Sequence, residues 1–168
     1  MSVAIPRRPL KPDTGERVTE LGEAQRLIAQ GAVRKALGLE PVDLRLGLDI
    51  ARNQLQKGAP IEAFQTYAAL VVCDPSDPEL QAGLANCALL LGENSLALHA
   101  ASAIVALAPS DPRGYFLSGR ACLAMGQLTE ANEDLTEAMR LARGPQGDAA
   151  AILDESRKLL DRIALLKK

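Results

Sequence analysis

Apolar residues recur along the middle of the chain at the spacing of one buried helix face. In three segments they occupy positions i, i+4, i+7 and i+8, which is the pattern of a helix that packs along one side. Each segment lies 34 residues after the one before it. The pattern therefore predicts a helical unit that is repeated three times. The stripes are Ala63, Tyr67, Leu70 and Val71, then Ala97, Ala101, Ile104 and Val105, then Ala131, Leu135, Ala138 and Met139.

The residues that begin and end helices keep the same interval. An aspartate early in each unit can cap a helix with its side-chain oxygen, and a following proline suits the first helical position. A glycine then ends this first helix in a left-handed conformation, and a later proline stops the second helix. Each unit is thus predicted to be two antiparallel helices joined by a short turn. The recurring sets are Asp43, Asp77 and Asp111, the glycines Gly58, Gly92 and Gly126, and the prolines Pro75, Pro78, Pro109 and Pro112.

A repeat of 34 residues made of two helices is the tetratricopeptide repeat (TPR) pattern. The sequence predicts an all-α fold, a TPR α-solenoid of three helical hairpins over residues 43–76, 77–110 and 111–144. The aromatic residue that is usual early in the first helix is present only as Tyr115, because Gly47 and Gln81 hold that place in the other units. The fold prediction therefore rests on the small residues and the turn residues.

Segments on both sides of the repeats complete the expected architecture. Residues 18–37 carry apolar residues at helical spacing after Thr19, which is the expected cap, and they predict an N-terminal helix. Residues 148–168 alternate apolar and charged positions, and they predict the C-terminal capping helix that covers the last apolar face of a solenoid. Residues 1–17 are rich in proline and predict a disordered N-terminal tail.

Composition and charge restrict the classes of partner. The formal net charge is −2, so the chain lacks the concentrated basic surface that nucleic-acid binding needs. No apolar run approaches the length of about 20 residues that spans a membrane, and no signal peptide is recognisable. We therefore expect no direct nucleic-acid partner, no membrane partner and a cytoplasmic location.

Residues with catalytic or metal-binding chemistry are scarce. The chain has one histidine, His99, and three cysteines, Cys73, Cys87 and Cys122, without a CxxC pair. These residues are too few and too scattered for a zinc site or a catalytic triad. The cysteines lie among apolar neighbours, so we expect buried, reduced thiols with no disulfide and no zinc. The sequence predicts no catalytic residue, no metal and no cofactor, and hence a protein that is not an enzyme.

The first helices of the three units carry the candidate binding surface. Residues five, nine and twelve places into each unit share one helix face, because their spacings are four and three. In stacked hairpins this face lines the concave side, so we expect an apolar groove for an extended hydrophobic peptide. The polar members would donate hydrogen bonds to the peptide backbone. Alternatively, these side chains pack on a flanking helix of the same chain or on a second copy. The predicted groove residues are Leu48, Arg52, Leu55, Ala82, Asn86, Leu89, Phe116, Arg120 and Leu123.

Short motifs in the second and third units match a known family. The second unit has Gly83-Leu84-Ala85-Asn86-Cys87 before Leu91-Gly92, and the third has Asp111-Pro112-Arg113, then Phe116, and Ala121-Cys122-Leu123 before Gly126. With these motifs and its flanking helices, the chain resembles the class II chaperones of bacterial type III secretion, which protect hydrophobic translocator proteins. It departs from them where the family often has Tyr or Phe, at Leu48, Arg52 and Leu55.

The resemblance implies a bacterial cytoplasmic chaperone that keeps translocator proteins soluble and competent for secretion. Its client would be a pore-forming translocator with a short segment, anchored by Pro and Leu, that lies extended in the groove. The resemblance also implies weak homodimerisation through the N-terminal helix and, as in some members, assistance to a transcriptional activator. The alternative from another class is a generic TPR adaptor that scaffolds a protein complex.

Overall fold

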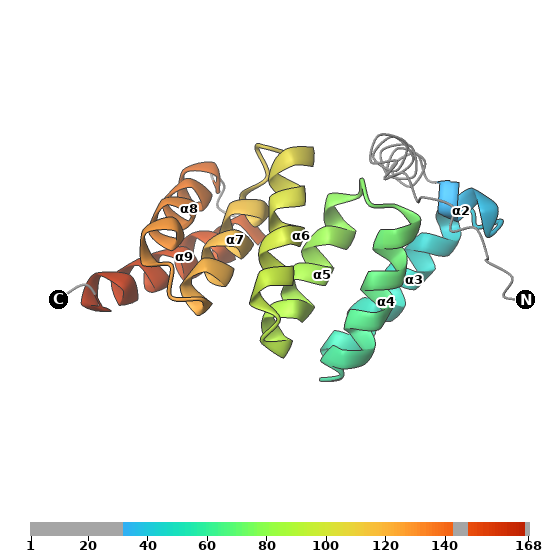
Figure 1. Ribbon diagram of the computed structural model, residues 1–168, viewed down its shortest axis with the longest axis horizontal. Coiled ribbons are helices and arrows are strands. Elements are labelled where there is room, and N and C mark those ends of the chain that lie inside the picture. The colour runs from blue at the N-terminus through green and yellow to red at the C-terminus, as the bar shows by residue number, and fades with distance from the viewer. Residues whose placement is uncertain (1–31, 143–147, 167–168) are drawn as a thin grey trace, which may run out of the picture.

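The protein is built from helices throughout the part of the chain that its structure, a computed structural model, describes, which is residues 32–142 and 148–166. After the short helix α2, three helical hairpins follow one another along the long axis of the molecule, and a long helix α9 comes last (Figure 1). The predicted all-α TPR solenoid is therefore confirmed. The helices are α2 (Ala32–Ala36), α3 (Pro41–Gln56), α4 (Pro60–Cys73), α5 (Pro78–Leu91), α6 (Asn94–Leu107), α7 (Pro112–Ala124), α8 (Leu128–Leu141) and α9 (Asp148–Leu166).

Two of the three predicted aspartate caps are present. The Asp77 side chain accepts a hydrogen bond from the backbone N–H of Glu79 at 2.7 Å, and Asp111 accepts one from Arg113 at 2.9 Å. The expectation for Asp43 is wrong, because α3 begins at Pro41 and Glu40 holds the capping position. Proline presets the helical φ angle, so the first helix starts earlier than its counterparts. Asp43 instead lies in the first turn and accepts a hydrogen bond from the backbone N–H of Glu40 at 2.8 Å.

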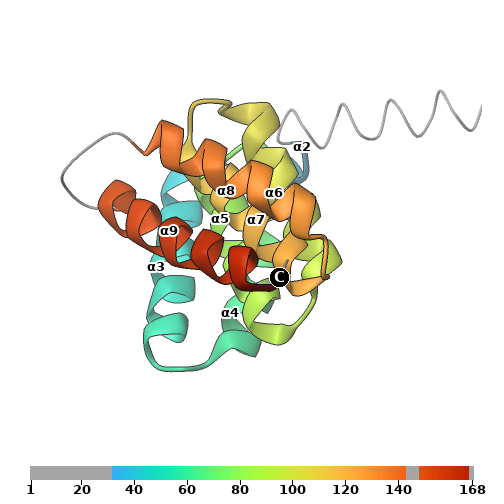
Figure 2. The same ribbon diagram turned by 90° about the vertical axis from the view of Figure 1, so that its left-hand side faces the viewer.

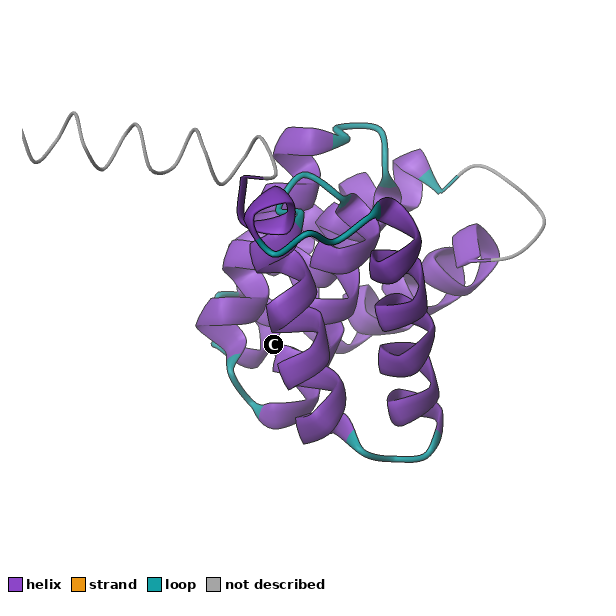
Figure 3. Cartoon of the chain, turned by 90° about the vertical axis from the view of Figure 1, so that its right-hand side faces the viewer, coloured by secondary structure: helices purple, strands orange, loops and turns teal. Residues whose placement is uncertain are grey.

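The turn inside each hairpin depends on a glycine with a left-handed backbone. Gly58, Gly92 and Gly126 have φ angles of 73°, 79° and 78°. A residue with a side chain rarely adopts this conformation, whereas glycine does so without steric cost. The three glycines therefore turn the chain at the same place in each unit, as the 34-residue interval predicts, and Figure 3 shows the resulting helices (purple) and connecting loops (teal).

The core is made mainly of alanine, leucine and cysteine. Ala63, Ala97 and Ala131, which hold equivalent places in the three second helices, are fully buried. Their small side chains allow the two helices of a hairpin to pack closely. The three cysteines are buried, as expected, and burial raises the pKa of the Cys87 thiol to about 11, so this thiol stays protonated at neutral pH.

Helix α9 lies against α7 and α8 at the end of the solenoid (Figure 2). Ile152 and Ile163 on its inner face are buried, and Ile163 joins an apolar cluster with residues of α7 and α8. The predicted tail over residues 1–17, and the predicted helix over 18–37 up to residue 31, lie outside the described residues. Of that predicted helix, the structure describes α2 and the turn that follows it.

Candidate peptide-binding groove

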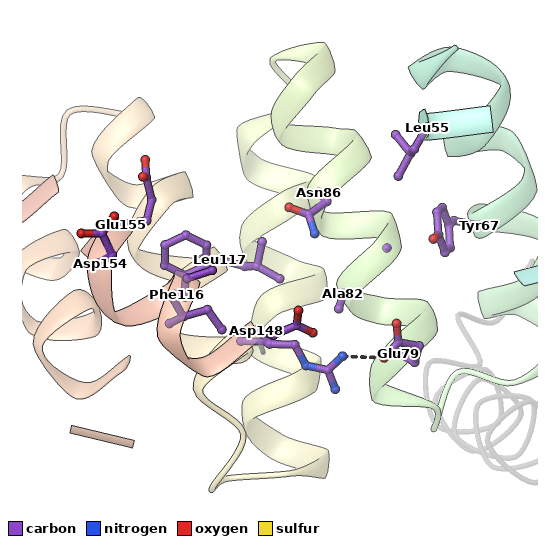
Figure 4. Close-up of a pocket in the computed structure, with 14 residues that line it drawn as sticks. Leu55, Tyr67, Glu79, Ala82, Asn86, Phe116, Leu117, Asp148, Asp154 and Glu155 are labelled. Carbon is purple, nitrogen blue, oxygen red and sulfur yellow. Dashed lines mark hydrogen bonds and ion pairs between the residues drawn. The ribbon is translucent and has the colours of Figure 1, made fainter. Parts of the chain in front are cut away.

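One groove receives side chains from all three hairpins and from α9 (Figure 4). Its volume is about 520 Å³. Leu55 of α3 and Tyr67 of α4 lie at one end, Ala82 and Asn86 of α5 lie in the middle, and α7 and α9 form the other end. The groove therefore runs along the solenoid, across the repeats, as a site for an extended chain would. The remaining lining residues are Glu79, Gly83, Arg113, Phe116, Leu117, Asp148, Ala151, Ile152, Asp154 and Glu155.

The repeat interval explains how distant residues meet in this groove. Residues separated by 34 positions occupy the same place in adjacent hairpins, so their side chains project from the same face of the solenoid. Ala82 and Phe116 are such a pair, and both line the groove. The missing side chain of Gly83 allows Tyr67 to lie directly against α5, with the tyrosine ring almost completely buried. Tyr67, Ala82 and Phe116, together with Ile152 of α9, thus form the apolar floor of the groove.

A chain of ion pairs joins the three hairpins along one wall of the groove. Glu79 of the second hairpin accepts hydrogen bonds from Arg52 of the first at 2.9 Å and from Arg113 of the third at 2.5 Å. Arg113 also bonds Asp111 at 2.7 Å. Burial by itself would raise the pKa of Glu79, but the bonds from Arg113 and Arg52 outweigh it and hold that pKa below its usual value. Glu79 is therefore ionised at neutral pH and bridges three repeats.

Glu79 and Arg113 were not among the predicted groove residues, although the sequence carries a signal for their pairing. The two residues are 34 positions apart and opposite in charge. In a repeat protein, opposite charges at equivalent places of consecutive units can pair across the interface between the units. Searching the repeat register for such pairs would have identified this bridge.

Arg120 has a different environment from the other arginines near the groove. It donates a hydrogen bond to the side-chain oxygen of Asn86 at 3.3 Å, and its guanidinium lies 5.5 Å from the centre of the Phe116 ring. Burial lowers the pKa of Arg120, in contrast to Arg52 and Arg113, whose pKa values are raised by their bonds to carboxylates. Arg120 is therefore a half-buried cation held by an amide and an aromatic ring.

The structure distributes the nine predicted groove residues over several places. Leu55, Ala82, Asn86 and Phe116 line the groove, and Arg52 bonds to one of its wall residues, Glu79. These five form the part of the predicted surface that the fold brings together.

The other four predicted residues do not line the groove, although Arg120 contacts two residues that do, Asn86 and Phe116. Leu48 lines a separate hollow beside α2, and Leu89 packs against an apolar cluster of Ala88, Ala97 and Ala121. Arg120 and Leu123 line a hollow formed by α7, α8 and α9. Leu123 belongs to the cluster that includes Ile163, so it packs against the C-terminal helix of its own chain, which is the alternative that the sequence left open.

The described residues contain neither a membrane span nor a metal centre. None of the helices in 32–142 and 148–166 combines the length and the apolar content that crossing a bilayer requires. In the same ranges, no three His, Cys, Asp or Glu side chains come together as metal ligands would.

The fold and the groove define a three-hairpin TPR solenoid with a partly apolar groove that runs across its repeats. No family model matches the chain. The low calcium response locus protein H of Yersinia pestis is 33% identical over 92 residues, which are 55% of this chain and 55% of that protein. The chain thus spans about half the length of the curated relatives it matches.

Solved structures extend this similarity over most of the chain. The Yersinia enterocolitica translocator chaperone SycD, in complex with a peptide of the translocator YopD, has a TM-score of 0.69 and 27% identity, covering 77% of this chain and 98% of that one. PcrH, a protein of Pseudomonas aeruginosa, in complex with the chaperone-binding region of PopD, has a TM-score of 0.71 and 26% identity, covering 78% and 98%. The predicted resemblance to the type III secretion translocator chaperones is therefore confirmed.

Proposed function

We propose that this protein is a cytoplasmic, non-enzymatic chaperone that binds hydrophobic translocator proteins of a type III secretion system. An extended segment of the client lies in the groove and anchors the rest of the client to the chaperone. The observation that carries the proposal is the apolar floor, to which all three hairpins and α9 contribute. The similar proteins SycD and PcrH, crystallised with translocator segments, support this assignment.

The geometry indicates how the groove would hold a client. Leu55 and Tyr67 lie at one end of the groove and Phe116 lies towards the other, so the groove can receive successive apolar side chains of one extended segment. Burying one Leu or Phe side chain contributes roughly 1.5–3 kcal/mol, so two anchors change the affinity by about a hundredfold or more. A client held in this way has its aggregation-prone segment covered until secretion.

Blocking the groove from α9 provides a test that leaves the core intact. Ala151 is exposed and lines the groove, so Ala151→Trp should fill part of it. Ala164 is also exposed on α9 but does not line the groove, which makes Ala164→Trp the matched control. The chaperone is co-expressed with a hydrophobic translocator protein from the same genome, and the client that co-purifies in the soluble fraction is measured, together with the thermal midpoint of each variant.

We expect the wild type and Ala164→Trp to retain the client and Ala151→Trp to lose it, with similar thermal midpoints for all three. A folded Ala151→Trp variant that keeps the client would show that the groove is not the binding site. A wild-type protein that leaves the translocator insoluble would contradict the chaperone function and favour a generic TPR adaptor. Homodimerisation through residues 18–37 stays a prediction.

A further inference from the structure

We infer that the client segment carries a lysine or arginine next to its apolar anchor, and that the wall formed by α9 receives this basic side chain. The inference rests on the proposed function, because it concerns the same groove. It adds a charge requirement to a site whose floor recognises apolar side chains. The residues that carry it are Asp148 and Glu155, with Asp154 beside them.

The charges that line the groove do not cancel. Glu79 and Arg113 bond to each other and to Arg52 and Asp111, so this wall offers balanced charge to a ligand. The wall on α9 carries three carboxylates, and its nearest cation, Lys158, lies 2.7 Å from Asp154 and 3.8 Å from Glu155.

Asp148 has no cation within the 4 Å range of an ion pair among the described residues. The groove is therefore acidic along one side only.

Acidic and apolar groups share one face of α9, with the two apolar residues between the two carboxylates. Asp148, Ala151, Ile152 and Glu155 are spaced by three, one and three residues, so they project towards the groove together. Seven residues of helix separate Asp148 from Glu155, which is about 10 Å, or about three residues of an extended chain. A segment that places an apolar side chain on the floor therefore has its neighbouring side chains within reach of a carboxylate.

The helix dipole explains only part of this arrangement. Asp148 lies in the first turn of α9, where a negative charge stabilises the helix. Glu155 lies beyond the first turn, where this effect has fallen away. Glu155 offsets the charge of the half-buried Arg120, but its side chain is 51% exposed and faces the groove, so it is also accessible to a ligand there.

Selection from a library of random dodecapeptides displayed on phage tests the inference with the full-length protein. The wild type is compared with the charge-reversed double variant Asp148→Lys and Glu155→Lys. A matched double variant, Glu133→Lys and Asp161→Lys, makes the same change in net charge at exposed sites that do not line the groove. Ala151→Trp, with its groove blocked, defines the background.

We expect peptides selected by the wild type and by the matched variant to be enriched in apolar residues and in Lys and Arg. The charge-reversed variant should keep the apolar enrichment and select Asp and Glu instead. In a selected peptide, replacing the basic residue by Glu should weaken binding to the wild type by about tenfold. If the reversed variant is unfolded, the pair Asp148→Asn and Glu155→Gln should lose the preference for basic residues without gaining one for acidic residues.

The other outcomes separate the two proposals. If the wild type selects apolar peptides without a charge preference, the inference is wrong but the groove remains the binding site. The same holds if a charge preference appears and the α9 variants leave it unchanged. If the wild type enriches no peptides above the blocked variant, both the proposed function and the inference fail.

Discussion

Replacing Gly83 by alanine would test the close approach of α5 to α4 that forms the floor of the groove. A Cβ atom at this position would overlap the Tyr67 ring at Cε1 and Cζ and lie 2.5 Å from Cδ1. The ring is rigid and only 3% exposed, so it cannot move aside into solvent. Either the ring must leave its place in the core or the two helices must separate.

The size of the effect follows from two opposing contributions. Overpacking a core costs about 1–3 kcal/mol, and a clash with an aromatic ring belongs at the upper end of that range. Alanine regains up to about 1 kcal/mol over glycine inside a helix. We therefore expect Gly83→Ala to lower the free energy of unfolding by about 2 kcal/mol. Because Tyr67 lines the groove, client binding should weaken as well.

Gly47→Ala is the matched control for this substitution. Its Cβ would lie 2.7 Å from Cδ2 of Leu70, which is the far end of a flexible side chain that can shift. The gain in helix propensity should then dominate, and stability should stay unchanged or rise by up to about 1 kcal/mol. Urea unfolding followed by far-UV circular dichroism measures both variants. If Gly83→Ala proves as stable as Gly47→Ala, the close packing of Tyr67 on α5 is wrong.

Three further predictions use the same unfolding assay. Glu79→Gln should lower the free energy of unfolding by about 1 kcal/mol or less at neutral pH. The pKa of Glu79 is below 4.5 in the folded protein and about 4.5 in the unfolded chain, and protonation breaks its ion pairs. The difference from the wild type should therefore shrink as the pH falls below 4.5. A stability difference independent of pH would contradict this. Burial raises the pKa of Asp134, which accepts a hydrogen bond from Ser118, so its charge destabilises the fold as the pH rises. Asp134→Asn should therefore be more stable than the wild type at about pH 7, and the two proteins should be equally stable at about pH 3. Ser156 is buried with an unbonded hydroxyl, so Ser156→Ala should leave stability unchanged or raise it by about 1 kcal/mol, and a clear loss would reveal a hidden partner.

The fold could be predicted because each hairpin depends on local signals that the sequence repeats. The glycines at the turns and the alanines between helices have the same function in every unit, so the interval of 34 residues identifies them without knowledge of the tertiary structure. The start of α3 differs because Pro41 and Glu40 begin the helix before Asp43. This local competition between two start signals was not resolved by the repeat pattern.

The groove was only partly predictable because α9 does not belong to the repeat. The register places Leu55, Ala82 and Phe116 on one surface, and the fold brings them together. The repeat register gives no information about how α9, which lies outside the repeats, packs against α7 and α8. That helix covers Leu123 and contributes the acidic wall, so both the loss of one predicted contact and the gain of three carboxylates depend on tertiary packing alone.

The polar residues of the predicted groove show how equivalent positions in a repeat can differ in function. Arg52, Asn86 and Arg120 occupy the same place in the three units and were expected to donate hydrogen bonds to a client backbone. In the structure Arg52 bonds to Glu79, and Arg120 bonds to Asn86. Each guanidinium has further N–H donors that can bond a client backbone, but such a bond replaces one to water and contributes only about 0.5–1.5 kcal/mol of net free energy. Burying two apolar anchors contributes about 3–6 kcal/mol, so under the proposed function the floor supplies most of the binding free energy, and the proposed charge preference of α9 selects among apolar segments.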